Sequence, residues 1–391
     1  MKKSISRRGA LKAFFATGSI VALGGLGLRS YNQVDYSEQA YQMWQHDDPL
    51  GYKVAEYLVM AGTLAASPHN TQPWKFGVTE NTINLYADHS RHLGQADPVR
   101  RMLAQGLGCA IENMTVMAPA IGYQLSVDTS ICNDRFHNDG LVAKMEYQRL
   151  SQSGLGTVNG KEIKNRPEIQ AIFNRQTNRS SYSGIGKVSS QYFDSLHKMQ
   201  PISGIEVAWA SDREQCQQIG QLCSTTVREF LSGDATNDAM QWFRRSREEW
   251  LSTGDGISIF PNDAPLMIKH WMELAATKDD LINQQSKQSE IDMTDKSCDQ
   301  VPLWGVIHSS ADLPHDWVNA GRVLEKCYLS VTQLGYAICP VSYPVESVVG
   351  REALRKLIGL PENRIPQALV RVGYASKMER SVRRKLTSVL I

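Results

Sequence analysis

The residues with the clearest chemical potential lie at positions 67–74, where the sequence reads Ser-Pro-His-Asn-Thr-Gln-Pro-Trp. Pro68 and Pro73 stiffen a turn, and Asn70 and Gln72 present side-chain amides. Such an amide can pair with both a carbonyl and an imide N–H, which is what the edge of a flat heterocycle such as a flavin offers. The alternative is a helix-to-strand turn whose amides bond to their own backbone, and the residues alone favour this alternative.

Regular elements are expected on both sides of this turn. Apolar residues recur at helical spacing over 52–66 and 98–121, the second helix with small residues on one face, and strands are expected at 75–79, 82–87, 123–127 and 141–147. After a Gly- and Ser-rich loop at 151–160, we expect a helix near 191–199, a strand at 204–210, helices through 250, a strand at 303–308, helices at 317–334 and 348–358, and a strand at 368–373. The chain is therefore divided into a leading segment (1–30), a first half (50–165) and a second half (166–391).

The stretch 252–299 stands apart because it is polar and lacks a sustained apolar period. Two interpretations are open: a solvated surface loop, or a lid over a functional site.

The first segment has the pattern of an export signal. Ser6-Arg7-Arg8-Gly9-Ala10-Leu11-Lys12 precedes an uncharged, glycine-rich run that is short for a membrane span, and it resembles the twin-arginine signal, with Ala10 in place of Phe. The twin-arginine machinery exports folded proteins, often with a cofactor on board. We therefore expect an exported, periplasmic protein, membrane-anchored only if the signal is retained.

Composition excludes several classes of function. Of 391 residues 42% are hydrophobic and 21% charged, as in an ordinary globular protein, and the net charge of +2 argues against a nucleic-acid-coating protein. Seven cysteines do not make a disulfide scaffold, and the odd count leaves at least one thiol unpaired. No cysteine or histidine spacing indicates a metal site.

Four segments resemble the FMN-dependent nitroreductase family. Residues 65–74 look like its flavin-ring turn, 175–179 (Arg-Gln-Thr-Asn-Arg) like its phosphate-binding Arg-x-Ser-x-Arg, 334–340 like the stretch over the ring, and 366–374 like its closing strand. In an ordinary family member the arginine motif comes before the turn, whereas here the order is reversed. The resemblance therefore implies an α+β protein of two tandem nitroreductase-like halves, an internal pseudo-dimer with one complete flavin site, as in the Acg-type branch.

The resemblance also implies the site residues. FMN phosphate would be held by the 175–179 motif and by a late basic cluster, Arg383-Arg384-Lys385. The turn would contact the ring edge, and residues 340–342 would contact the opposite ring face. No catalytic residue is assigned. The predicted contacts are Ser67, Pro68, His69, Asn70, Gln72, Arg175, Gln176, Thr177, Arg179, Pro340, Val341, Ser342, Arg383 and Arg384. The late cluster is equally consistent with a solvated charge run. The bulky aromatics Tyr182, Trp304 and Tyr343 crowd the ring or belong to the core, and the core is favoured.

Two functions from different classes follow. The first is an FMN oxidoreductase that reduces a small electrophile, and the second is an FMN-holding protein with a covered ring and little turnover. Export bears on the choice between them, because NAD(P)H, the family's usual electron donor, is scarce outside the cytoplasm. Either another donor reduces the flavin, or turnover is not the task of this protein. The fusion of two halves further implies that a monomer is sufficient for flavin binding.

Overall fold

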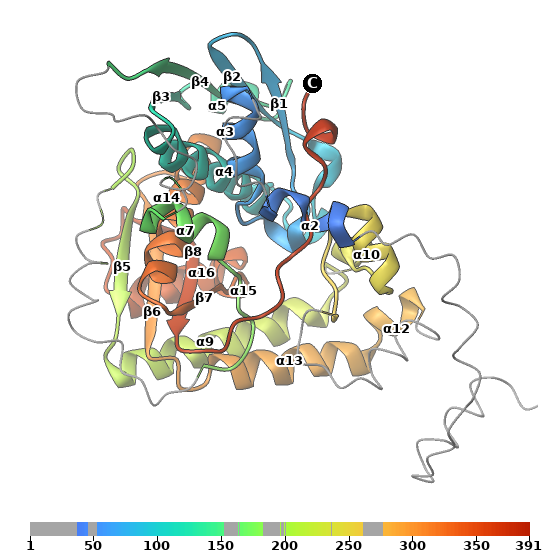
Figure 1. Cartoon of the computed structure of the whole chain (residues 1–391). Helices are drawn as coiled ribbons and strands as arrows, with labels where there is room; N and C mark the ends of the chain where they lie inside the picture. Colours follow the sequence, from blue (N-terminus) through green and yellow to red (C-terminus); the bar gives the residue numbers. More distant parts are fainter. Residues whose placement is uncertain are drawn as a thin grey trace, which may run out of the picture. The chain divides into compact units, whose positions relative to one another are not determined.

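The computed structural model describes residues 37–45, 53–151, 163, 165–182, 196, 199, 201–235, 237–260 and 277–391. Ser37–Ile391 form one unit by their contacts, and both halves lie within it (Figure 1). The export segment and most of the helix expected near 191–199 lie outside the described residues.

The first half builds a four-stranded antiparallel sheet. Helix α3 (Val54–Thr63) leads through the turn into β1 (Trp74–Val78) and β2 (Thr82–Ala87). Helix α4 (Arg101–Ala120), β3 (Tyr123–Asp128), the short α5 (Cys132–Arg135) and β4 (Leu141–Arg149) follow. The strand order is β1-β2-β4-β3. All the helices and strands expected in this half are confirmed, and α5 is added.

The second half repeats this order as β5-β6-β8-β7, again antiparallel. Its elements are α7 (Pro167–Asn174), β5 (Glu206–Ala210), β6 (Leu303–Ser309), α14 (Pro314–Gln333), β7 (Ala337–Pro340), α15 (Tyr343–Glu346), α16 (Val348–Leu357) and β8 (Ile365–Gly373). Each sheet also has one shift in strand register at the equivalent place: β2 shifts against β4, and β6 shifts against β8. The protein is therefore α+β, with two tandem halves of one plan.

Helices α4 and α14 join the two halves at the centre of the unit (Figure 1). A Cβ on Gly108 would lie 1.9 Å from the carbonyl oxygen of Val318, and one on Gly321 would lie 2.0 Å from that of Gln105. Real Cβ atoms do not approach backbone that closely, so glycine at both positions is what allows the two backbones to touch. Gly108, one of the small residues predicted on one face of the first helix, lies at this contact.

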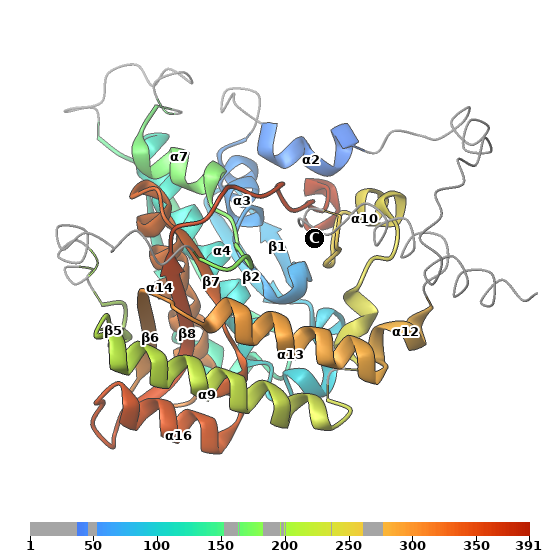
Figure 2. The same cartoon turned by 90° about the horizontal axis from the view of Figure 1, so that it is seen from below.

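An insert of about ninety residues separates β5 from β6 and has no counterpart between β1 and β2. It contains α9 (Arg213–Ser232), η6 (Ala239–Trp242), α10 (Arg247–Thr253), α12 (Lys278–Ile282) and α13 (Gln284–Cys298). The interpretation of 252–299 as a surface loop is therefore wrong where it is described at 278–298. Helix α13 packs along α9 (Figure 2) but buries only Thr294, Ser297 and Cys298, so it carries almost no apolar stripe to detect.

The chain after β8 crosses to the first sheet (Figure 1). There the amide of Phe76 donates to the carbonyl of Val389 at 2.8 Å, and Ile391 donates to Phe76 at 3.0 Å. On the way the tail passes α2 (Ser37–Gln45), where the Trp44 indole N–H donates to the carbonyl of Ser381. The tail thus covers the exposed edge of β1, which would otherwise present unpaired backbone groups.

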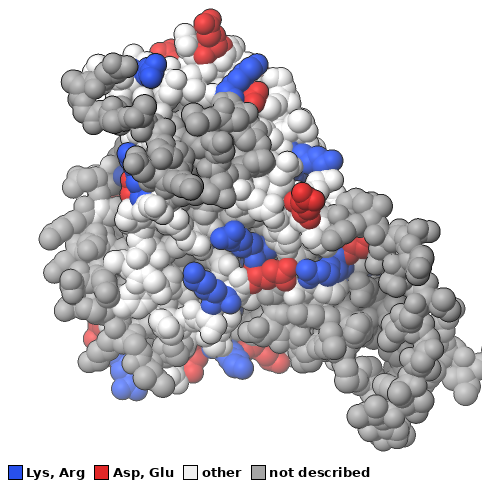
Figure 3. Space-filling model, viewed as in Figure 1, with Lys and Arg blue, Asp and Glu red and all other residues white. Residues whose placement is uncertain are grey.

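Charges of both signs are interspersed over the described surface seen in Figure 3, as the small net charge leads one to expect. Among the described helices, none has the length and apolar character needed to cross a membrane.

Candidate functional site

The turn between α3 and β1 has an unusual backbone. Its three-residue helix η3 (Pro68–Asn70) includes His69 at φ 45° and Asn70 at φ 53°, and Gln72 follows at φ 50°. Asparagine tolerates this left-handed region, whereas histidine and glutamine adopt it at a cost of about 1–2 kcal/mol each. Such strain persists only where the surroundings hold it, and it concentrates at functional sites.

The two amides predicted for a ring edge have protein partners. The Asn70 amide N–H donates to the carbonyl of Val382 at 3.1 Å, and its oxygen accepts from Arg383. The Gln72 amide donates to the carbonyl of Gly254 at 2.7 Å, and its oxygen accepts from the Arg384 backbone N–H. These bonds satisfy both side chains, and they tie the turn to the tail and to the insert. Their contact with a flavin ring stays a prediction.

Arg175 and Arg383 are buried at the C-terminal end of α3. Arg175 donates to the carbonyl of Leu64 at 2.8 Å and lies 3.6 Å from a carboxylate oxygen of Glu325. Arg383 donates to the carbonyls of Thr63 (2.7 Å) and Leu64 (3.0 Å) and to further acceptors. Cations at this position offset the negative end of the helix dipole and satisfy carbonyls left without intrahelical partners. The donors of Arg383 have protein acceptors, whereas the buried Nε of Arg175 has no hydrogen-bond partner within the described residues. That the two arginines contact a phosphate stays a prediction.

The side chains between the two arginines of the motif also face the protein. The Gln176 amide donates to the carbonyl of Met378 at 2.6 Å and accepts from the Met378 N–H at 2.9 Å, as a strand neighbour would. The Thr177 hydroxyl bonds to that of Tyr328 at 2.7 Å, and its backbone pairs with Ile338 of β7. The motif is therefore held in place from both sides.

Arg179, in contrast, is exposed and has neither a hydrogen bond nor an ion pair among the described residues. Its charge acts on two neighbours from distant parts of the chain, His69 of the turn and Tyr343 of α15. Burial, together with the charge of Arg179, lowers the pKa of His69 to about 4, so the imidazole is neutral near pH 7. The Nδ1 atom of His69 is buried without a partner in the described structure.

The residues predicted above the ring lie where β7 passes into α15. Pro340 ends the strand, the Val341 N–H donates to the carbonyl of Leu369 at 2.8 Å, and Ser342 precedes the helix. Next to them, the Tyr343 hydroxyl donates to Glu290 of α13 at 2.8 Å. The sequence favoured a core position over a ring contact for Tyr182, Trp304 and Tyr343. Trp304 and Tyr182 are indeed buried in the core.

Part of the insert covers the turn, through residues that the sequence did not single out. The Gly256 N–H donates to the carbonyl of Asn70 at 3.2 Å, beside the Gly254–Gln72 bond. Asp255 between these glycines is buried and pairs with Arg91 and, at 2.6 Å, with Arg244. We call 254–256 with these two arginines the Asp255 clasp. The members are separated by about 10 to 160 positions, so no local pattern could have revealed it.

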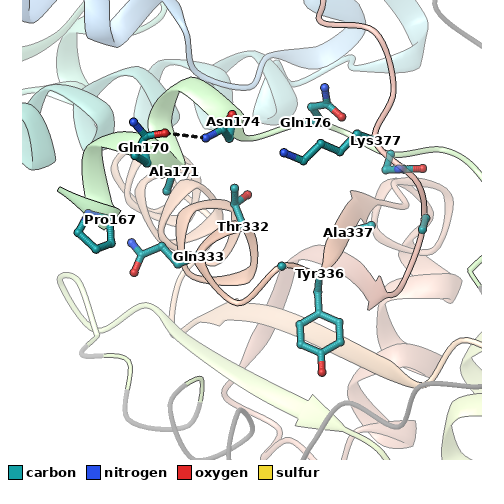
Figure 4. A pocket seen from close by; sticks show the side chains of 13 residues that line it. Pro167, Gln170, Ala171, Asn174, Gln176, Thr332, Gln333, Tyr336, Ala337 and Lys377 are labelled. Carbon is teal, nitrogen blue, oxygen red and sulfur yellow. Dashed lines mark hydrogen bonds between the residues drawn. The ribbon is translucent and has the colours of Figure 1, made fainter. Parts of the chain in front are cut away.

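The turn, the motif at 175–179 and residues 383–384 thus meet, and Arg179 links them electrostatically to the start of α15. A separate pocket of about 330 Å³ lies between α7, the end of α14 and the tail (Figure 4). Its wall is rich in amides, including Gln170 and Asn174, with Lys377 as its cation, and it shares Gln176 with the predicted site. Within the described ranges no cluster of three or more metal-ligating side chains occurs.

Comparisons with known proteins point to one family. Residues 265–374 match the Nitroreductase family. A Mycobacterium tuberculosis protein described as uncharacterized is 23% identical over 349 residues, covering 85% of this chain and 91% of its own. A protein of the same species, named as a candidate NAD(P)H nitroreductase, acg, is 23% identical over 336 residues, covering 83% of this chain and 90% of its own.

Among solved structures, the FMN- and NADPH-dependent nitroreductase NfnB from Sphigopyxis sp. strain HMH aligns with a TM-score of 0.37 at 14% identity, covering 57% of this chain and 96% of its own. The fold assignment rests on the strand order described above. The match of residues 265–374 and the similarity to proteins named as NAD(P)H nitroreductases support an oxidoreductase of the nitroreductase type.

Proposed function

We propose that this protein binds one FMN per chain and reduces a small electrophile by hydride transfer through the flavin. The observation that carries the proposal is the guanidinium of Arg179, which has no partner among the described residues and acts on the strained turn, in a chain whose residues 265–374 match the Nitroreductase family. FMN, when bound, supplies the hydride chemistry, and the protein supplies binding, orientation and electrostatics.

The donor set fits this cofactor. A phosphate monoester carries close to two negative charges and favours guanidinium donors. Arg179 has no partner among the described residues and can supply one. Within the same described part of the chain, Glu325 is the one carboxylate that acts on both Arg175 and Arg383, so two buried cations face one anion behind the turn. The partnerless Nδ1 of His69 offers a further hydrogen bond, either donated or accepted.

The chain's own residues then have distinct tasks. Arg179 binds the phosphate, and His69, neutral near pH 7, bonds to a polar atom of the cofactor without adding charge. Arg383 and Asn70 fix the turn to the tail, and the Asp255 clasp fixes it to the insert. This division assigns binding to the free groups and positioning to the bonded ones.

One observation favours the second function, an FMN-holding protein with low turnover. The clasp fastens the insert to the same turn that is predicted to line the ring, and Tyr343 of α15 is bonded to α13 of that insert. Of the two arginines on Asp255, Arg91 lies outside the insert. Opening the cover therefore breaks the Arg91–Asp255 ion pair together with the hydrogen bonds that join Gly254 and Gly256 to the turn.

Spectroscopy of the purified protein separates these functions. A flavin absorption band that bleaches promptly on addition of NADPH and returns with a quinone or nitro compound supports the oxidoreductase. A flavin band that persists with NADPH but bleaches with dithionite supports the holding protein. Absence of flavin, together with failure of the apoprotein to bind added FMN, would contradict both.

The phosphate assignment is tested by Arg179→Ala. Loss of one charge-assisted contact should cost about 1.5–3 kcal/mol, and therefore weaken FMN binding by roughly 10- to 100-fold. Arg213→Ala, which removes another exposed arginine at the start of α9, is the control and should bind as the wild type does. An affinity for Arg179→Ala within twofold of this control would show that the phosphate lies elsewhere.

We also propose that the protein is exported by the twin-arginine machinery and binds FMN as a monomer. The signal-like start supports the first proposal, and the presence of both halves in one chain supports the second. Light scattering of the flavin-loaded protein tests the second: flavin retained by a dimer and lost from the monomer would refute it.

A further inference from the structure

Two buried cysteines meet where the insert begins and ends. Helices α9 and α13 approach so closely that a Cβ on Gly220 would lie 2.6 Å from the carbonyl oxygen of Cys298. Cys223 lies one turn beyond Gly220 on the same face of α9 and packs in the same buried cluster as Cys298. Both cysteine side chains are almost fully buried, at 0% and 3% exposure, at the place where the backbones of the two helices come close together.

The two thiols also differ in acidity. They hydrogen-bond to each other, and the bond received from Cys223 lowers the pKa of Cys298, helped by the charge of Arg371. Burial raises the pKa of Cys223. Arg371 is fixed nearby, because it donates to the carbonyl of Ser297 at 3.0 Å. A thiol with the lower pKa next to a second thiol is the arrangement that undergoes disulfide exchange.

We propose that Cys223 and Cys298 form a disulfide that closes the insert at its base when the protein meets a disulfide oxidant. The Cys298 thiolate attacks the oxidant and forms a mixed disulfide, releasing one oxidant thiol. The Cys223 thiolate then displaces the second oxidant thiol from Cys298. Two protons leave the cysteines, two electrons reduce the oxidant's S–S bond to two thiols, and one S–S bond is formed in the protein.

The other five cysteines are placed differently. Cys109, Cys132 and Cys327 are buried in the core cluster around α4 and α14, and the Cys216 thiol donates to the carbonyl of Ala210. Cys339 at the end of β7 is the nearest competitor, since its side chain bonds to Arg371.

The bond would link the first helix of the insert to its last one. The chain between them, including Arg244 and residues 254–256 of the Asp255 clasp, would belong to one covalently closed loop, whereas Arg91 lies outside it. A loop of that length restricts the unfolded chain strongly, so oxidation should raise the melting temperature by about 3–6 °C. This inference concerns the insert itself and does not depend on whether FMN is bound.

The test uses the full-length protein, incubated with excess oxidised glutathione a few degrees below its melting temperature, so that the buried thiols become accessible. Unfolding in an alkylating reagent followed by mass spectrometry should show five alkylated cysteines and a peptide cross-linked through 223 and 298. Dithiothreitol should restore seven and reverse the rise in melting temperature.

Cys216→Ser is the matched control, since it removes another buried thiol of α9 and should still give the cross-link. Cys223→Ser and Cys298→Ser should each lose it. Seven reactive thiols after oxidation, a glutathione adduct on Cys298 without the cross-link, or a link from Cys298 to Cys339 would each overturn the proposal.

Discussion

Arg383 should contribute more to stability than to cofactor binding, and Arg383→Met tests this. In addition to the carbonyls at the end of α3, its guanidinium donates to the Asn70 side chain at 3.1 Å and to the carbonyl of Val382 at 2.9 Å, and it lies over the Trp44 ring. Methionine keeps an unbranched apolar stem but has none of these donors and no guanidinium over the Trp44 ring. The change therefore removes the hydrogen bonds and the ring contact while it retains the packing of the stem.

The magnitude follows from the groups left behind. Arg175 still serves Leu64, whereas Thr63, Ala65 and Asn70 each lose a donor in a buried site. Removing one partner from a buried charged network costs about 3–5 kcal/mol. Since the entropy of unfolding grows with length, a unit of roughly 350 residues should lose about 4–7 °C in melting temperature.

Arg380→Met is the matched control for a thermal melt of the apoproteins. Arg380 also lies over the Trp44 ring, at 5.4 Å, but among the described residues its one hydrogen bond is a long one to Asn174, at 3.5 Å. We expect its variant to melt within about 1 °C of the wild type, as surface changes generally do. If Arg383→Met melts like this control yet binds FMN 10-fold more weakly, Arg383 contacts the phosphate and the capping role is wrong.

Three further outcomes are expected. Burial raises the pKa of Glu346 to about 7, so the folded state keeps a proton that the unfolded state releases near pH 4.5. As the pH rises from 4.5 to 7, the free energy of unfolding should therefore fall by at most about 3 kcal/mol. Urea titrations across this pH range measure the decrease, and Glu346→Gln should make it smaller. Gly321→Ala should abolish soluble expression or lower the melting temperature sharply, because its Cβ would meet a backbone oxygen of α4, whereas Gly233→Ala, with open space around it, should change neither. Exchange of Arg7 and Arg8 for lysine should stop appearance of the protein outside the cytoplasm in fractionation, and unchanged export would refute the twin-arginine route.

Local patterns predicted most of the regular structure. The helices at 54–63 and 101–120 and all strands of the first sheet follow from spacing of apolar residues and from the turn at 67–74. These features depend on residues within a few positions of one another, which sequence periodicity reports directly. Helix α13 was not predicted, because its buried face consists of Thr294, Ser297 and Cys298 and therefore shows no periodic apolar pattern.

The roles within the site were decided by the tertiary structure. Arg175 and Arg179 lie four positions apart in one motif, yet the first is buried against Glu325 and the second is exposed and unpaired among the described residues. The sequence by itself determined that guanidiniums, amides and a strained turn are present in this chain. Which of them remain free to bind a ligand depends on acceptors up to about 320 positions away, such as Thr63 for Arg383, and only the complete fold brings those together.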